Sequence, residues 1–522
     1  MSSFSGKRLA KNTLLMYFRL GIGIIVNFIT TKVVFNVLGV DNYGLYGVVA
    51  GIIVLFSFVS SALASSAQRF FSYELGKINY ERLKEIYNAL IRIFGLISIV
   101  IVILAETVGL WFLNTKMDFP EGKLGLANFV YQVSVITTIA QVFKIPYDAA
   151  IISTEKFDFY AYTSLINAFL QLGVVYLLKI IPLESTKVYV VLLLVVALMM
   201  LLWYFLYCRR KIQFIEYTSK VNKDVFKELL SFSGWSFFGA LCNMGYRQGV
   251  NIVINVFFGV VLNAAFSIAN QVSALVNQFV TGFQSAYNPQ ITKTCSVGSP
   301  LEQTKIVSMA SKISFSLLLI VGFCVVLNID ELLNLWLGEI PQDTTFLCSL
   351  MVIAAIIDSI SDPFWIVIFA TGKISRYQTS CAVLMIANVL LTILAFSMGY
   401  GVEISMYIRI AMNLGIMMVR LIIVNKQTQI SILSFIKNVI LKDLLVVLLL
   451  IPVYIIANIF SDGYLRLFLS TPICVIIISL LLIFVLFEGS EREAAKRMIL
   501  SKIKRYIYGI DCLFKEILLF FN

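Results

Sequence analysis

Long apolar runs separated by short polar segments dominate the chain. Each run of 18 or more mostly apolar residues is long enough to cross a bilayer as a helix of about 20 residues. We expect fourteen spans near residues 12–38, 43–64, 88–113, 124–152, 159–182, 188–208, 230–259, 262–291, 305–328, 346–371, 377–400, 402–425, 441–460 and 464–487. The first run is too long for a signal peptide and lacks a small-residue cleavage site, so we expect it to stay as a span. The pattern predicts an all-α polytopic membrane protein.

Composition narrows the possible functions. Of the 522 residues, 60% are hydrophobic and 13% are charged, and the mean hydropathy is +0.91. The absence of histidine removes most zinc-enzyme, Ser-His and Cys-His chemistries. The eight cysteines form no CxxC pair and are expected to be buried small hydrophobes. We therefore expect a transporter rather than an enzyme, with no cofactor other than a coupling Na⁺ or H⁺ and no nucleic-acid partner.

The basic residues predict the orientation in the membrane. With the N-terminus inside, the inside segments hold 30 of the 41 Lys and Arg residues, whereas the outside segments hold 5. Cytoplasmic segments are enriched in Lys and Arg, so this split predicts a cytoplasmic N-terminus and C-terminus. The tail, residues 488–522, mixes seven basic residues with apolar ones, and we expect it to lie on the cytoplasmic membrane face or to form a solvated helix.

An internal repeat at a lag near 220 residues organises the chain. Residues 33–49 resemble residues 252–269, and four identities recur at a lag of 217, which pair Pro146 with Pro363, Thr154 with Thr371, Lys156 with Lys373 and Tyr160 with Tyr377. Six spans in each copy make the copies parallel, so the halves should be related by a pseudo-two-fold axis along the membrane normal. We expect a six-helix bundle at 1–208, a basic linker at 209–229, a second bundle at 230–425, two extra helices at 441–487 and the tail at 488–522.

Particular segments resemble a known family. The stretch LGVDNYGLYGVVAGIIVLFSFVSSALASSAQRFFSYELGK (38–77) and the segments SIANQV and AYNPQITK within 267–293 are similar to polysaccharide flippases of the MOP superfamily. That group includes Wzx-type O-antigen and teichoic-acid exporters and is related to the lipid II flippase and to MATE drug exporters. The resemblance implies alternating-access translocation of an undecaprenyl-pyrophosphate-linked oligosaccharide across a bacterial inner membrane. We expect a monomer, because both bundles are present in one chain, with membrane lipids and other polysaccharide assembly proteins as its partners.

Basic residues inside the spans are candidates for binding a pyrophosphate. An ionisable side chain deep in a span costs at least about 2 to 3 kcal/mol and is usually paired, cavity-facing or functional. Arg19 and Lys32 lie in the first span, Arg247 lies mid-way along the seventh, and Arg409 lies in the twelfth. Guanidinium groups bind phosphate oxygens bidentately, so the repeat-related Arg19 and Arg247 could face each other across a cavity. The alternatives are snorkelling for Arg19 and Lys32 and an ion pair within the bundle for Arg247.

Carboxylates inside the spans are candidates for ion coupling. Asp358 and Asp362 share one face of the tenth span, and their mutual repulsion would favour uptake of H⁺ or Na⁺. Asp358 could instead pair with Arg409. Asp148 in the fourth span is a third candidate, although Lys144 lies four residues before it and could neutralise it.

Arg69 and Glu74 follow the second span in a segment that resembles the QRFxxxEL element of the family. They are gate candidates, with helix capping and loop docking as the alternatives.

A competing function is a MATE-like H⁺- or Na⁺-coupled exporter of small organic cations, which would need an acidic cavity. A glycan polymerase or ligase is a third, and it would need a large external loop that the chain lacks.

Overall fold

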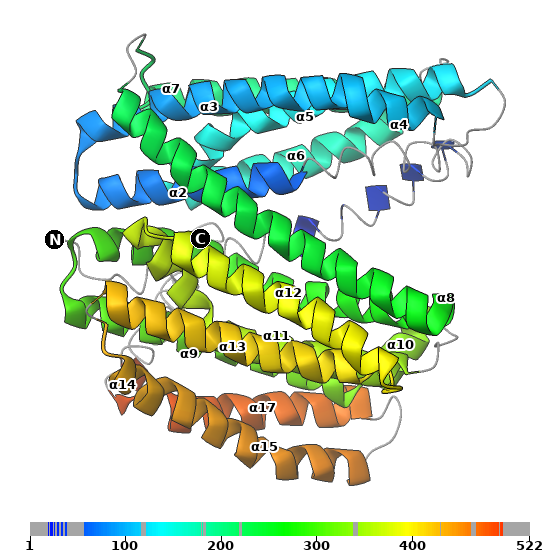
Figure 1. Ribbon diagram of the computed structural model, residues 1–522, viewed down its shortest axis with the longest axis vertical. Helices are drawn as coiled ribbons and strands as arrows, with labels where there is room; N and C mark the ends of the chain where they lie inside the picture. Colours follow the sequence, from blue (N-terminus) through cyan, green and yellow to red (C-terminus); the bar gives the residue numbers. More distant parts are fainter. Residues whose placement is uncertain are drawn as a thin grey trace, which may run out of the picture.

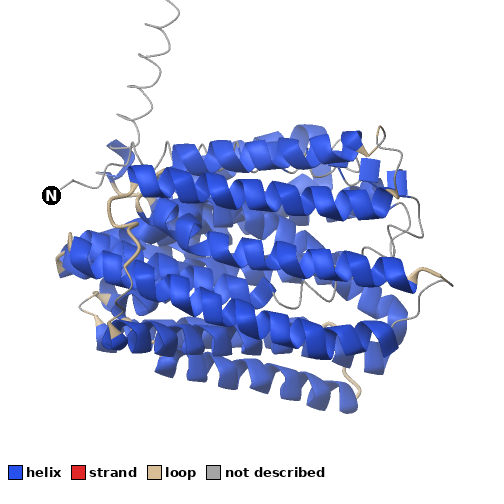
Figure 2. Ribbon diagram, turned by 90° about the horizontal axis from the view of Figure 1, so that it is seen from above, coloured by secondary structure: helices blue, strands red, loops and turns tan. Residues whose placement is uncertain are grey.

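A computed structural model describes most of the chain in atomic detail. The described residues are 57–115, 122–178, 180, 184–218, 222–337, 343–428, 430–460, 466–489 and 491–493, together with scattered positions between 19 and 38. All regular structure in these ranges is helical (Figure 2), as predicted. Ten of the described helical segments are long and apolar enough to span a membrane.

The helices follow the predicted order. Those of the N-terminal half are α2 (Ser57–Gly76), α3 (Tyr80–Leu104), α4 (Leu110–Thr115), α5 (Leu124–Ser153), α6 (Phe157–Leu177) and α7 (Ser185–Lys211), and a π-helical turn at Ala105–Gly109 joins α3 to α4. Those of the C-terminal half are α8 (Lys223–Val297), α9 (Pro300–Leu327), α10 (Ile329–Leu337), α11 (Thr344–Thr371), α12 (Ser375–Ser397), α13 (Ile404–Gln427), α14 (Ile432–Phe435), α15 (Leu441–Phe460) and α17 (Thr471–Leu481).

Helix α8 is two membrane-crossing helices joined end to end. Its continuity is broken at Gly259, whose φ of +76° and ψ of −169° are not helical and are readily adopted only by glycine. The break falls between the predicted spans 230–259 and 262–291. The two parts of α8 and the ten apolar segments account for the predicted spans from 88–113 onward, and α2 contains the last part of the span 43–64. Most of the first two predicted spans lies outside the described residues.

Local sequence signals set several helix ends. Ser299 and Glu302 form a reciprocal capping box at the start of α9, and Pro300 occupies the first turn, where its missing N–H costs nothing. The side chain of Asn79 accepts a hydrogen bond from the backbone N–H of Arg82 at the start of α3. Helix α11 ends at Gly372, whose φ is +78°. The caps start α3 at Tyr80 and α9 at Pro300, before the predicted spans 88–113 and 305–328, whereas α11 ends at Thr371 as predicted.

The helices form two bundles and an added helix pair. In Figure 1, α2 to α7 lie above α9 to α13, and α8 runs diagonally from the upper layer to the lower one. Helices α15 and α17 lie at the bottom, against α9. This all-helical arrangement of two bundles and an added helix pair, seen over the described residues, confirms the predicted fold class. One apolar core cluster joins Phe70 of α2 with Phe232 of α8 and Phe364 of α11, so it belongs to both bundles. The second large cluster contains only residues from the C-terminal half.

The inside segments of the sequence analysis meet at one end of the molecule, which we call the basic end. Hydrogen bonds and ion pairs link its segments: Arg82 with Glu228, Lys84 with Glu216, Lys156 with the backbone oxygen of Lys211, Gln427 with that of Lys373, and Ser431 with Thr304. The pKa of the exposed Glu216 carboxyl lies below its usual value because the Lys84 ammonium hydrogen-bonds it at 2.7 Å. The shared apolar cluster shows that the two bundles pack together at this end.

Repeat-paired residues occupy similar places in their helices. Pro146 lies inside α5 seven residues before its end, and Pro363 lies inside α11 eight residues before its end. A proline at these positions removes one backbone hydrogen bond from each helix. The next helix contains Tyr160 in the first half and Tyr377 in the second, and each tyrosine contacts an arginine. Arg19 belongs to the first span and Arg420 to the twelfth, which the repeat does not pair, so the match covers the positions in the helices and not these contacts.

Candidate functional site

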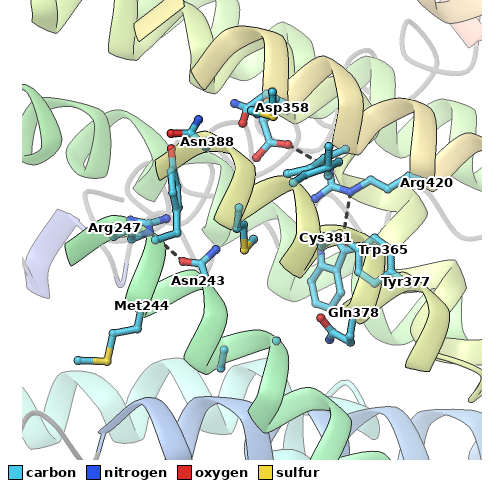
Figure 3. Close-up of a pocket in the computed structure, with 18 of the residues that line it drawn as sticks. Asn243, Met244, Arg247, Asp358, Trp365, Tyr377, Gln378, Cys381, Asn388 and Arg420 are labelled. Carbon is cyan, nitrogen blue, oxygen red and sulfur yellow. Dashed lines mark hydrogen bonds and ion pairs between the residues drawn. The ribbon is translucent and has the colours of Figure 1, made fainter. Parts of the chain in front are cut away.

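A cavity of about 610 Å³ lies within the C-terminal half, facing the N-terminal bundle. Its walls come from α8, α11, α12 and α13, and Ser65 of α2 also lines it. We call it the central cavity. Figure 3 shows that Arg247 of α8 and Arg420 of α13 enter it from different sides, and that the side chain of Met244 projects away from the labelled polar residues. The cavity is therefore polar where the C-terminal helices converge.

Two cavity arginines have no carboxylate partner among the described residues. The Arg247 Nε donates to Asn243 Oδ1 at 2.9 Å, one turn away on the same helix. The Arg409 Nη1 lies 2.7 Å from the Sδ of Met351, and a thioether is only a weak acceptor. Arg247 is repelled by the charge of Arg409 and attracted by that of Asp358, with which it forms no ion pair. The positive charges of Arg247 and Arg409 are available to an anion in the cavity.

The carboxylates of α11 pair with Arg420 instead. The Arg420 Nη1 lies 3.1 Å from Asp358 Oδ1 and 3.3 Å from Asp362 Oδ1, and it donates to Ser361 Oγ at 2.7 Å. Arg420 Nε donates to the hydroxyl of Tyr377 at 3.2 Å. The anticipated pair of Asp358 with Arg409 is wrong, because Arg420, three turns further along α13, faces this part of α11. Asp358 and Asp362 do share one helix face, as predicted.

The charges in and beside the cavity sum to a positive value. Arg420 compensates one of the two aspartates that it contacts, so that cluster carries one net negative charge. Arg247 and Arg409 add two positive charges. A guanidinium group keeps its charge even when it is buried. The central cavity is therefore suited to an anion and unfavourable for a cation that approaches Arg247 or Arg409.

The N-terminal bundle holds a second ionic cluster. Lys144 Nζ lies 3.2 Å from Asp148 Oδ2 on α5 and 4.4 Å from the ring centre of Tyr204. The guanidinium of Arg19 lies 4.6 Å from the ring centre of Tyr160. The i,i+4 pairing of Lys144 with Asp148 occurs as anticipated. Arg19 faces this cluster and does not line the central cavity, and Lys32 lies outside the described residues.

Arg69 fastens one bundle to the other at the basic end. Its Nε donates to the backbone oxygen of Phe369 at 3.0 Å, and its Nη2 donates to that of Ala370 at 2.9 Å, so it caps the C-terminus of α11. The guanidinium is surrounded by the rings of Phe70, Tyr73 and Phe232 at 4.3 to 5.2 Å. Arg69 and Glu74 were expected in a loop, but both belong to α2, which continues to Gly76.

Among the described residues, the Glu74 carboxylate pairs only locally, with Lys77 at 3.9 Å. A second connection between the bundles comes from Lys293 of α8, whose Nζ lies 2.8 Å from Glu155 Oε1. Phe232 packs edge-on against Phe369 with ring centres 5.5 Å apart. Phe369 lines the central cavity, whereas Arg69, Phe232 and Ala370 line another cavity at the basic end. We call the layer formed by Arg69, Phe232 and Phe369 the partition.

Sequence reasoning missed two parts of this arrangement. Arg420 lies within the predicted span 402–425, so the rule that selected Arg247 would also have selected it. The connection between Glu155 and Lys293 had no sequence signal, because its partners are 138 positions apart in polar segments. Depth estimates along single helices do not reveal which helix faces meet.

Comparisons with known proteins agree with this architecture. No family model matches the sequence, and neither does any curated protein. Solved structures do match the fold. A MATE point mutant has a TM-score of 0.66 at 12% identity, with 81% of this chain and 97% of its own covered. A multidrug resistance MATE family transporter of the MOP superfamily, in an outward-facing conformation, has a TM-score of 0.64 at 14% identity, with 80% and 97% covered.

A MOP superfamily transporter from Pyrococcus furiosus has a TM-score of 0.64 at 14% identity, with 81% of this chain and 97% of its own covered. Its binding pocket is described as having reversed polarity that suggests a different function. This chain has the fold of MATE and MOP transporters. Together with the ten apolar spans, the fold makes it a multi-pass membrane protein.

Proposed function

We propose that this chain is a flippase that moves a polyprenyl-pyrophosphate-linked oligosaccharide, of the O-antigen or capsule type, across a bacterial inner membrane. The observation that carries the proposal is the pair Arg247 and Arg409, which project positive charge into the central cavity without a carboxylate partner among the described residues. The exposed Arg247 and the half-buried Arg409 both line the cavity, so a ligand there can reach both guanidinium groups. A pyrophosphate would compensate both.

The chemistry of the two groups fits a pyrophosphate. Guanidinium groups bind phosphate oxygens through paired, charge-assisted hydrogen bonds. Neighbouring asparagines, Asn243, Asn388 and Asn413, add neutral polar groups of the kind that sugars can hydrogen-bond. The cavity therefore offers a cationic centre for the pyrophosphate and amide groups for the first sugars.

Alternating access accounts for the partition. In this conformation Arg69 and the pair of Lys293 with Glu155 close the basic end, which the positive-inside rule places in the cytoplasm. Substrate that enters from the cytoplasm must separate these contacts. The gate role predicted for Arg69 thus has a physical basis, whereas Glu74 contributes no contact between the bundles.

Asp358, Asp362 and Asp148 remain the coupling candidates. Arg420 compensates only one of the two aspartates on α11, so H⁺ or Na⁺ could compensate the other when the contacts of Arg420 change. One Asp148 oxygen is buried without a hydrogen-bond partner among the described residues. Uptake of a cation at these carboxylates would link the ion gradient to the movement of the bundles.

A MATE-like exporter of small organic cations is the second candidate. It is favoured by the structural likeness to MATE transporters and by the carboxylates of α11. The excess positive charge of the central cavity opposes it. The two functions predict opposite selectivity for the charge of the substrate.

Transfer between leaflets in proteoliposomes tests the proposal. We would compare a fluorescent polyprenyl-pyrophosphate glycan with a small cationic dye under an imposed pH or Na⁺ gradient. We expect transfer of the glycan only, and Arg247→Gln with Arg409→Gln should reduce it at least about tenfold. Arg210→Gln, which removes the same charge from an exposed position on α7, is the matched control. Dye efflux without glycan transfer would establish the cation exporter instead.

A further inference from the structure

A larger cavity, of about 970 Å³, opens at the basic end beyond the partition. We call it the vestibule. Its walls are the ends of α2, α11 and α13, both ends of α8 and the beginnings of α9 and α12. Four basic residues line it, namely Arg69, Lys373, Arg376 and Lys426, against one acidic residue, Glu228.

The positive charge of the vestibule is largely uncompensated. Glu228 is engaged by Arg82, whose Nη2 lies 2.7 Å from its Oε2, so it does not neutralise the lysines. Over the ranges that the structure describes, Lys373, Arg376 and Lys426 make no ion pair with a carboxylate. Arg69 is occupied by the end of α11. Three cationic side chains thus surround one cavity and are available to an anion.

Helix α12 adds backbone donors to the same wall. Its cap residue, Ile374, has no side-chain acceptor, so no side chain caps the first turn, and Ile374, Ser375 and Arg376 line the vestibule. The positive end of a helix with free N–H groups favours a phosphate. The loop before α12 is held in place, because Thr371 Oγ1 donates to Gln427 Oε1 at 2.9 Å and Gln427 Nε2 donates to the Lys373 oxygen at 3.1 Å.

Part of the lining is apolar and reaches the partition. Phe70, Phe232 and Trp235 belong to this part, and Trp235 is 37% exposed. Phe232 contacts Phe369, which belongs to the central cavity, so only the partition lies between the two cavities at this point. The vestibule therefore combines a cationic rim, an aromatic wall and a closed connection to the central cavity.

We propose that the vestibule is an anion-binding site that holds the phosphate or pyrophosphate group of an amphiphilic substrate before the partition opens. Lys373, Arg376, Lys426 and the first turn of α12 would bind the phosphate oxygens. This proposal rests on the proposed function, because it places a loading site in front of the central cavity. The same phosphate chemistry could come from an anionic membrane lipid.

Binding of inorganic pyrophosphate to the purified full chain tests the site. We would use isothermal titration in nanodiscs of phosphatidylcholine, with Arg247→Gln/Arg409→Gln as the background so that the central cavity does not contribute. The test variant adds Lys373→Gln, Arg376→Gln and Lys426→Gln. The matched control adds Lys223→Gln, Lys305→Gln and Lys437→Gln, which remove three exposed charges at the same end outside the vestibule. The single change Arg376→Gln covers the case that the triple variant does not fold.

We expect the background protein to bind pyrophosphate at one site. The vestibule triple variant should weaken the affinity for pyrophosphate about tenfold, and the control triple variant should change it less than about twofold. Equal weakening in both triples, or no binding in the background, would overturn the proposal. Nanodiscs with phosphatidylglycerol separate the two sources. If phosphatidylglycerol competes with pyrophosphate and this competition is lost in the vestibule triple variant, a lipid phosphate also occupies the site. If phosphatidylglycerol does not compete, the site binds the pyrophosphate group and not the lipid phosphate.

The proposed function can fail separately. If the wild-type chain and the Arg247/Arg409 background bind the same number of pyrophosphates, the central cavity is not a pyrophosphate site. The vestibule proposal is then decided by the effect of the Lys373/Arg376/Lys426 triple variant alone. If the background binds fewer pyrophosphates than the wild-type chain, the central cavity is supported as a pyrophosphate site. If the affinity of the remaining site is then unchanged by the vestibule triple variant, the vestibule proposal is refuted.

Discussion

Replacing Arg69 by methionine should open the basic end. Methionine keeps the apolar stem against Phe70 and Phe232 but removes both hydrogen bonds to the end of α11. A hydrogen bond that involves a charged group contributes about 1.5 to 3 kcal/mol. Two such bonds give at least about 3 kcal/mol, and since about 1.4 kcal/mol is a factor of ten, the closed state should lose more than about 100-fold in its equilibrium with the open state.

Arg82→Met is the matched control. Arg82 also connects the two bundles at the basic end, but its partner Glu228 is half exposed and water replaces the lost contact. An exposed ion pair contributes about 0.2 to 1 kcal/mol, so the control should shift the equilibrium by no more than about fivefold. The two arginines differ chiefly in burial, which is the property that the prediction tests.

Distances between spin labels measure the shift. Labels at Tyr80→Cys on α3 and Leu301→Cys on α9 lie on exposed positions of different bundles, and the eight native cysteines would be replaced first. Double electron–electron resonance should show one dominant distance in the parent protein and a longer, well-populated distance in Arg69→Met. Adding Glu155→Gln removes the pair with Lys293 and should increase the longer population further. An unchanged distribution in that double variant would refute the gate role of Arg69.

Three further predictions concern the C-terminal bundle. Asp358→Asn and Asp362→Asn should each alter the pH or Na⁺ dependence of transport in proteoliposomes. If both variants keep the pH and Na⁺ dependence of the parent protein, coupling at α11 is excluded. Arg420→Ala leaves both aspartates without their counter-ion and should destabilise the protein by about 3 to 5 kcal/mol in thermal unfolding, while an unchanged melting temperature would contradict the assigned pairing. Gly259→Ala places a Cβ at a φ of +76° and should cost about 1 to 3 kcal/mol in the same assay, whereas Gly234→Ala in the same helix has open space and should not destabilise it.

The ionic networks show where sequence reasoning stops. The rule that ionisable groups inside spans are functional or paired found Asp358, Asp362, Arg247 and Arg409, and all four lie in or beside one cavity. The same rule did not select the partner of the aspartates. Arg409 and Arg420 lie on the same helix, and choosing between them requires the rotation of α13 relative to α11, which no hydropathy pattern contains.

Arg69 shows a different limit. Its position after an apolar run indicated a loop, because a span was taken to end where its apolar residues end. The helix continues into the basic end, where Arg69 meets backbone oxygens 300 positions away in the sequence. Backbone acceptors carry no sequence signature, so their use by a side chain becomes visible only in the folded chain.

The sequence by itself determined the membrane class, the succession of spans, the distribution of basic residues and the two-bundle plan. A lipid environment imposes these features on each segment separately, through the length of its apolar run and the charges at its ends. The tertiary structure decided which charges meet, which cavity stays cationic and which contacts close the basic end. These depend on how helices rotate and cross, and pairs such as Arg420 with Asp358 form only when segments distant in sequence pack together.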